Sequence, residues 1–344
     1  MPETVHLLQI DGKIPNIALM RLASHHRALG DEVIYHHADS LISVHPFQFG
    51  REDKIYASAI FRRSLPILEQ LKWGRPDAVI GGTAVDPLRA DEAIPFPISP
   101  LIQRDVTALE SHGVTTAIQD YGLYPRFRAS IGYTQRGCRL SCPFCVVPQK
   151  EGKVREVATI ADIWRGDPWP REILLLDNDF FGQPHWRERI AELRDGQFKV
   201  SFNQGINARC LTDEAAEAIA SVRYYDDQMK TKMVYTAWDN RGDEERLFAG
   251  LNRLVKYGVK PDHVTVYMLC GYWPNETQAD REYRRKRLRD FGARPYPMVY
   301  EQNKTPELKG FQRWVIRRAD IGKHACSWDD FVAANYRPER VGMK

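Results

Sequence analysis

Residues 5–35 read VHLLQIDGKIPNIALMRLASHHRALGDEVIY, and this stretch predicts the fold of the first part of the chain. Val5–Ile10 is an apolar run typical of a buried strand. Ile17–Leu29 has its apolar residues near helical spacing, and Gly30 after it is a common residue at the end of a helix. Glu32–Tyr35 is expected to be a second strand. A strand, a helix and a strand in this order favour a parallel sheet with helices on its faces.

The same alternation predicts the architecture of the rest of the chain. Two more strands, Lys54–Ala59 and Asp77–Ile80, extend the first sheet into a Rossmann-like α/β domain. Beyond it, about six strand–helix units predict a partial (β/α)6 barrel of the TIM type. The expected strands of these units are residues 128–133, 172–176, 199–202, 233–237, 263–269 and 297–300. Their expected helices are residues 186–193, 212–220, 244–257 and 277–291.

Three segments are therefore expected along the chain. They are a Rossmann-like domain over residues 1–125, a partial barrel over residues 126–302 and a short helical extension over residues 303–344. A proline-rich stretch, residues 87–100, precedes the first boundary. In the extension, Leu308–Ala319 has the spacing of an amphipathic helix.

The composition is that of an ordinary globular protein. Hydrophobic residues make up 43% of the chain and charged residues 27%. Its length of 344 residues indicates two or three packed units. No apolar run approaches the roughly 20 residues that span a bilayer, and the first residues do not resemble a secretory signal. A cytoplasmic protein with no membrane partner is expected. The formal net charge of +4 permits a nucleic-acid partner without indicating one.

The six cysteines carry the strongest chemical signal. Three of them, Cys138, Cys142 and Cys145, lie within residues 132–145, GYTQRGCRLSCPFC. Crowded thiols in a reducing cytosol indicate metal or redox chemistry rather than disulfides. Three thiolates on a short loop can hold three irons of a cubane cluster, which leaves the fourth iron with an open position. The alternative is a structural zinc site, which would need a remote fourth ligand.

The Cys-x3-Cys-x2-Cys spacing, with Phe144 before the last cysteine, resembles the signature of the radical S-adenosylmethionine superfamily. The flanking residues 136–137 and 146–148 are similar to the branch that includes methylthiotransferases and cobalamin-domain enzymes. The resemblance implies a 4Fe-4S cluster that binds S-adenosylmethionine and receives one electron from a flavodoxin- or ferredoxin-type reductant. The cluster would then cleave S-adenosylmethionine to a 5'-deoxyadenosyl radical, which would abstract hydrogen from an unidentified substrate.

The resemblance also implies that S-adenosylmethionine is bound by residues after the barrel strands. The turn 177–179 stands where the family often has Gly-Gly-Glu, and its side chains could accept the hydrogens of the methionyl ammonium. Arg209 could pair with the methionyl carboxylate. A turn, solvated or packed role is the alternative for each of these residues. The candidate cofactor-binding residues are Phe144, Asp177, Asn178, Asp179, Asn203, Gln204, Arg209, Trp238 and Asp239.

The remaining cysteines, Cys210, Cys270 and Cys326, are candidate catalytic residues that would donate hydrogen or carry a methyl group. Burial as an inert thiol is the alternative for each. Cys326 also lies near His324, a weak pattern for nucleophilic chemistry. A second cluster on these three thiols is disfavoured by their wide spacing.

The first domain resembles the cobalamin-binding-like domain found upstream of many radical enzymes. Its cobalt-binding motif, Asp-x-His-x-x-Gly, would fall at residues 11–16, which read DGKIPN and contain no histidine. A cobalamin-dependent radical methyltransferase is therefore an alternative function that lacks its usual cobalt ligand. The methylthiotransferase reading is also weakened, because no cysteine precedes Cys138.

A function of a different class would use the basic segment Arg281–Arg289, REYRRKRLR. On a helix these charges would cover most of the surface, and a solvated face is their usual role. If they lined the mouth of the barrel, they would favour RNA or a phosphorylated substrate. The alternative to an enzyme is thus a zinc-stabilised RNA-binding protein.

Overall fold

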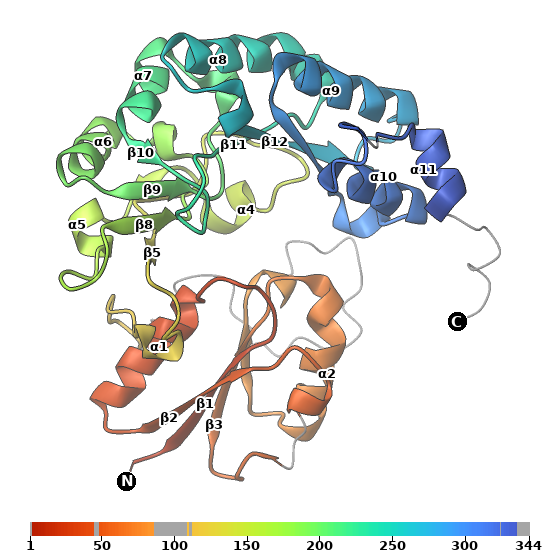
Figure 1. The fold of residues 1–344 in the computed structure, drawn as a ribbon. Helices are drawn as coiled ribbons and strands as arrows, with labels where there is room; N and C mark the ends of the chain where they lie inside the picture. Colours follow the sequence, from red (N-terminus) through yellow and green to blue (C-terminus); the bar gives the residue numbers. More distant parts are fainter. Residues whose placement is uncertain (1, 45–47, 86–108, 110–111, 324, 336–344) are drawn as a thin grey trace. The chain divides into compact units, whose positions relative to one another are not determined.

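The structure is a computed structural model that describes residues 2–44, 48–85, 109, 112–323 and 325–335. The chain divides into two compact units (Figure 1). Unit 1 contains Met1–Ile131 and Cys145–Gly152, and unit 2 contains Gly132–Phe144 and Lys153–Lys344. The proline-rich stretch at residues 87–100 lies outside the described residues.

Unit 1 is built on a four-stranded parallel sheet of order β2-β1-β3-β4. Its strands are β1 (Thr4–Gln9), β2 (Glu32–His37), β3 (Lys54–Ser58) and β4 (Val79–Gly81). Its helices are α1 (Ile17–Ala28), α2 (Leu65–Gly74) and α4 (Val147–Glu151). The parallel sheet expected at the start of the chain is therefore confirmed.

Both faces of β1 are buried, which explains why its sequence is apolar without alternation. Leu7 and Leu8 point to opposite faces, and neither is exposed. Leu8 shares an apolar core with Leu68 of α2, and Figure 1 shows α1 on the other side of the sheet. Helix α1 begins after Asn16, whose side chain accepts a hydrogen bond from Leu19 N at 3.2 Å.

Unit 2 alternates strands and helices along the chain, as its sequence predicts. From the junction onward the strands are β5 (Ser130–Gly132), β6 (Gln135–Arg136), β7 (Arg155–Glu156), β8 (Glu172–Leu175), β9 (Lys199–Phe202), β10 (Arg223–Tyr224), β11 (Val234–Ala237), β12 (Val264–Cys270) and β13 (Arg294–Val299). The helices are α5 (Ile160–Ile163), α6 (Trp186–Asp195), α7 (Asp213–Ser221), α8 (Glu244–Lys256), α9 (Gln278–Phe291), α10 (Pro306–Ile316) and α11 (Trp328–Asn335). Figure 1 shows α6 to α9 along the outer side of these strands.

These strands form several sheets. One has the order β10-β9-β8-β5, a second has the parallel order β11-β12-β13, and β6 pairs with β7 in a small antiparallel ribbon. No closed barrel is present in the described part of the chain. The protein is thus an α/β protein with several parallel sheets. No helix among the described residues is both long and apolar enough to cross a membrane.

Close packing of α8 on the short 3₁₀ helix η8 (Ala208–Cys210) requires a glycine at position 250. A Cβ atom added to Gly250 would lie 1.9 Å from the carbonyl oxygen of Ala208. Alanine in place of a helical glycine usually gains about 0.5–1 kcal/mol. Here we expect Gly250→Ala to lower the free energy of unfolding by about 2 kcal/mol, because the clash falls on backbone. Urea denaturation followed by circular dichroism measures the change, and a raised midpoint would contradict the close packing.

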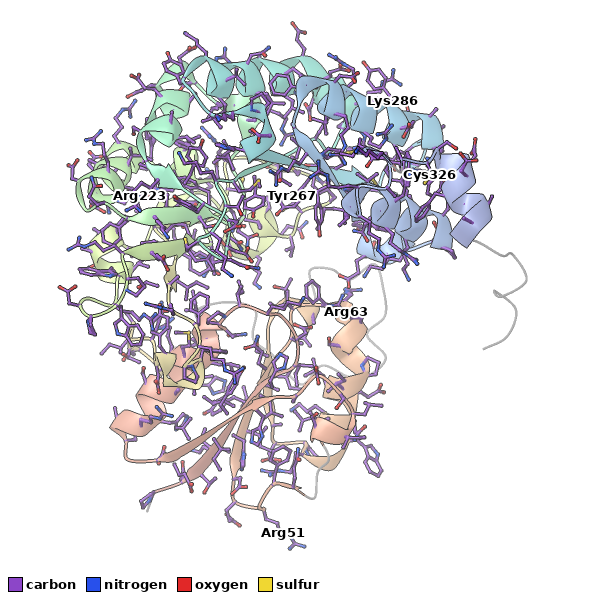
Figure 2. All side chains as sticks on the ribbon, viewed as in Figure 1. Arg51, Arg63, Arg223, Tyr267, Lys286 and Cys326 are labelled. Carbon is purple, nitrogen blue, oxygen red and sulfur yellow. The ribbon has the colours of Figure 1, made fainter. Side chains whose placement is uncertain are left out.

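The solvated face expected for the basic helix α9 is wrong for three of its arginines. Arg281, Arg284 and Arg285 are buried, because carboxylates from this helix and from other segments neutralise them. Their partners include Glu307, Glu276 and Asp320, respectively. Lys286, in contrast, is exposed on the outer surface of α9 (Figure 2). The sequence alone does not distinguish these positions, since only folding shows which carboxylates outside the helix, Glu276 just before it and Glu307 and Asp320 after it, pair with which arginine.

Candidate functional site

Several predicted cofactor-binding residues lie at the carboxyl ends of parallel strands in unit 2. Asp177 follows β8, Asn203 follows β9 and Trp238 follows β11. A hydrogen bond of 2.8 Å from Ile206 N to Tyr235 O joins the turn after β9 to β11. The carboxyl edge of parallel strands is where α/β proteins place their sites. The structure therefore brings these residues to the edge that was expected.

Asp177 is a buried carboxylate that holds the start of the cysteine loop. Its oxygens accept hydrogen bonds from Thr134 N at 2.8 Å, from Gln135 N at 3.2 Å and from the Thr134 hydroxyl. Burial raises the pKa of Asp177 to about 7, although these hydrogen bonds oppose the shift. Because its oxygens are engaged inside the protein, the geometry favours an anchoring role over a contact with an ammonium group.

We expect Asp177→Asn to change the way in which stability depends on pH. A carboxyl group whose pKa is raised on folding stabilises the folded state below its unfolded pKa of about 3.9. That contribution is lost as the pH rises through about 7, the pKa in the folded protein. Asparagine resembles the protonated carboxyl group. The free energy of unfolding of the variant should therefore rise relative to that of the wild type by about 2–4 kcal/mol from about pH 4 to about pH 7. Urea denaturation of both proteins across this range measures the difference, and a constant difference would contradict the raised pKa.

Asp179 and Gln135 fasten the same loop at a second point. The Asp179 carboxylate accepts a hydrogen bond from Arg139 N at 3.1 Å and forms an ion pair with Arg139 Nε at 2.9 Å. The buried Gln135 amide donates to Arg136 O at 3.0 Å and to Gly137 O at 2.6 Å, and it accepts from Asp179 N at 3.2 Å. Nothing in the sequence marks Gln135, because a single glutamine before a cysteine has no pattern of its own.

The cysteines of the loop are free thiols that are partly exposed. Leu140 N lies 3.4 Å from Cys138 Sγ, and Arg209 Nη2 lies 4.0 Å from Cys142 Sγ. Nitrogen donors beside sulfur are also found around the sulfurs of iron–sulfur clusters. Cys145 begins the segment Cys145–Gly152 that groups with unit 1.

The donor set of the loop matches an iron–sulfur cluster, although its side chains are not gathered around a metal position. Among the described residues, no three Cys, His, Asp or Glu side chains are placed so that they could hold a metal ion. Three thiols within the segment 138–145 nevertheless supply the soft ligands that iron–sulfur clusters use. Metal binding orders its own ligands in many small sites, so the separation of the thiols does not conflict with this match.

Arg209 lies between the cysteine loop and a carboxylate. Its Nη1 donates to Asp243 Oδ2 at 2.7 Å, and its Nε lies 3.3 Å from Asn207 Oδ1. Burial raises the pKa of the neighbouring Asp239 to about 6, while the charges of Arg209 and Arg284 act to lower it. Sequence reasoning missed Asp243, because it is distant from Arg209 in sequence and only folding brings the two together.

The predicted polar contacts after β8 and β9 differ in exposure. Asn178 and Asn203 are half-buried, whereas Gln204 is exposed. Gly205, which has a φ of 88°, turns the chain so that it approaches β11, and a Cβ atom at this position would lie 3.1 Å from Tyr235 O. The turn therefore presents Asn203 and Gln204 at the edge of the sheet.

Phe144 and Trp238 take part in aromatic packing. Phe144 meets Tyr272 edge-to-face with ring centroids 5.4 Å apart. Trp238 is fully buried and packs edge-on against Phe248 at 5.5 Å, so its role is packing rather than stacking on a cofactor. Tyr272 also lines a hollow of about 390 Å³, whose other lining residues include Gly271, Trp273, Glu276, Asn303 and Thr305.

The three remaining cysteines lie in different surroundings. Cys270 is buried in the apolar core, burial raises the pKa of its thiol to about 12, and its thiol lies 3.3 Å from Met268 O. Cys326 Sγ lies 3.6 Å from Ala319 O, and Cys210 is exposed at the end of η8. His324 lies outside the described residues. Cys270 therefore matches the inert alternative.

No protein-family model matches the chain, and no curated protein matches it at a significant level. The chemistry of the cysteine loop and of the edge around it is therefore the basis for a function.

Proposed function

We propose that the chain is an iron–sulfur protein whose 4Fe-4S cluster is held by Cys138, Cys142 and Cys145. More particularly, we propose a radical S-adenosylmethionine enzyme that abstracts hydrogen from a substrate still to be identified. The observation that carries both statements is the Cys-x3-Cys-x2-Cys loop, which the buried side chains of Asp177 and Gln135 anchor at the carboxyl edge of parallel strands. In this proposal unit 1 is a Rossmann-like domain and unit 2 is an open, partial barrel.

When bound, a cluster with one open iron supplies the electron that splits S-adenosylmethionine into methionine and a 5'-deoxyadenosyl radical. The residues of the chain have supporting roles. Asp177 and Asp179 hold the backbone of the loop, and Arg209 places a positive charge 4.0 Å from Cys142 Sγ. Asn178, Asn203, Gln204 and Asp239 are the proposed contacts for the polar parts of S-adenosylmethionine, and Phe144, which packs against Tyr272, is a proposed apolar contact.

The two alternative functions have less support. The Asp11 carboxylate, at the start of the cobalamin-type motif, accepts hydrogen bonds from Ile60 N at 2.8 Å, Phe61 N at 2.9 Å and the Ser64 hydroxyl at 2.8 Å. Asp11 therefore anchors a neighbouring loop of unit 1, and this role gives no support to the cobalamin-dependent alternative. RNA binding through α9 is disfavoured, because Arg281, Arg284 and Arg285 are buried in ion pairs.

Anaerobic reconstitution tests the proposal. The purified chain, treated with iron and sulfide without air, should bind about four irons and turn brown. Dithionite and S-adenosylmethionine should then yield 5'-deoxyadenosine, measured by chromatography. A colourless chain that binds zinc instead would contradict the cluster. A brown chain that yields no nucleoside would contradict the radical enzyme and leave only the iron–sulfur protein.

A further inference from the structure

Tyr235, Tyr267 and Tyr296 lie on the face of the β11-β12-β13 sheet that is turned away from the helices. Along β12, Val266 and Met268 point into the apolar core, so Tyr267 between them points to the other face. Tyr296 of β13 is paired directly with Tyr267, and Tyr235 of β11 shares the same face. Figure 2 shows Tyr267 on the side of the strands opposite α8 and α9.

Two of the three rings are stacked, and the third stands perpendicular to them. The rings of Tyr235 and Tyr267 are parallel within 4°, with centroids 5.7 Å apart. The ring of Tyr296 stands at 89° to that of Tyr267, with centroids 5.5 Å apart. All three side chains are half-buried, so part of each ring is accessible on this face. A perpendicular pair of aromatic rings is the basic element of the cages that bind organic cations.

The charges that act on these rings are negative. Burial raises the pKa of Tyr267 to about 12, and the Asp227 carboxylate adds to the shift. Burial also raises the pKa of Tyr235, to which Asp227 and Asp226 contribute. Arg294 precedes Tyr296 by two residues at the amino end of the face, where its charge acts on His263. This balance disfavours phosphate, nucleotide or RNA as a ligand and complements a cation.

The Tyr267 hydroxyl is free to take part in binding. Among the described residues, no side chain or backbone group donates a hydrogen bond to it or accepts one from it. Tyr267 also lies three residues before Cys270, the end of β12, which corresponds to about 10 Å along the strand. A group bound on Tyr267 would leave an attached carbon chain within reach of the carboxyl edge.

We propose that Tyr235, Tyr267 and Tyr296 form a binding face for an organic ammonium group. We further propose that the substrate of the enzyme carries this group, a statement that rests on the proposed function. The first statement does not depend on iron or S-adenosylmethionine, because the rings and the Asp227 carboxylate belong to the protein alone.

Calorimetric titration of the full-length, iron-free chain with choline tests the face. Its neutral isostere, 3,3-dimethylbutan-1-ol, is the matched probe. We expect choline to bind about tenfold more tightly than the isostere, because only the cation gains from the ring faces and from Asp227. Equal affinities, or no binding of choline, would overturn the proposal. Since the titration needs no cluster, its failure is distinguishable from a failure to form 5'-deoxyadenosine.

Variants locate the binding. Tyr267→Leu should weaken choline about tenfold, Tyr267→Phe should keep the affinity within about threefold, and Asp227→Asn should weaken it about threefold. Asp227 is exposed, so its variant is a test that does not disturb the core. Tyr257→Leu, at the end of α8, is the control and should leave choline binding unchanged. Full choline affinity in both Tyr267→Leu and Asp227→Asn would overturn the assignment to this face.

Discussion

Replacing Cys142 with alanine should abolish both the brown colour of the reconstituted chain and its formation of 5'-deoxyadenosine. A cubane cluster that keeps one open iron depends on three protein thiolates, and two thiolates hold it poorly. Arg209 Nη2 lies 4.0 Å from Cys142 Sγ, so the variant also leaves this guanidinium without its sulfur neighbour. Iron content after desalting and the yield of nucleoside with dithionite measure the two effects, and both should fall to background.

Two controls separate a ligand from a merely nearby residue. Ser141→Ala changes an exposed side chain on the same loop and should keep the iron content and the nucleoside yield of the wild type. Cys326→Ala removes a thiol from the C-terminal part of the chain and should keep the full iron content. Iron retained in Cys142→Ala, or lost to the same extent in Cys326→Ala, would contradict the ligand assignment.

Replacing Arg284 with alanine should be the most destabilising single change on α9. The guanidinium is buried, donates to Trp238 O at 2.8 Å and to Leu269 O at 2.9 Å, and pairs with the buried Glu276 carboxylate. Alanine leaves this carboxylate without its main partner and two carbonyl oxygens without a donor. We expect the free energy of unfolding to fall by about 3–5 kcal/mol, as for other buried ion pairs that lose one member. Urea denaturation followed by circular dichroism measures the loss.

Lys286→Ala is the matched control, because it lies on the same helix with a side chain that is 64% exposed. Its ion pair with Glu282 is long and solvated, so the change should stay within about 0.5 kcal/mol. In the double variant Arg284→Met and Glu276→Leu, the unpaired charge is gone, and about half of the lost stability should return. Similar losses in Arg284→Ala and Lys286→Ala would show that the buried pair contributes little.

The secondary structure of the chain follows largely from local sequence patterns. The apolar run of β1, the helical spacing of α1 and the helix α7 are found where they were predicted. Each depends on neighbours within a few residues, so a single sequence is sufficient to identify it. The cysteine spacing is local in the same way, and it remains the basis of the proposed cluster.

Contacts between distant residues were not predictable from the sequence. The role of Asp177 depends on the Thr134 backbone, and Asp243 pairs with Arg209 only because folding brings them together. Most of the longer strands and helices, and the thiol donors, could be predicted from residue type and short-range periodicity alone. The engaged carboxylates, the buried arginines and the tyrosines that share one face could be recognised only in the folded chain, because burial and charge pairing depend on segments that meet in space.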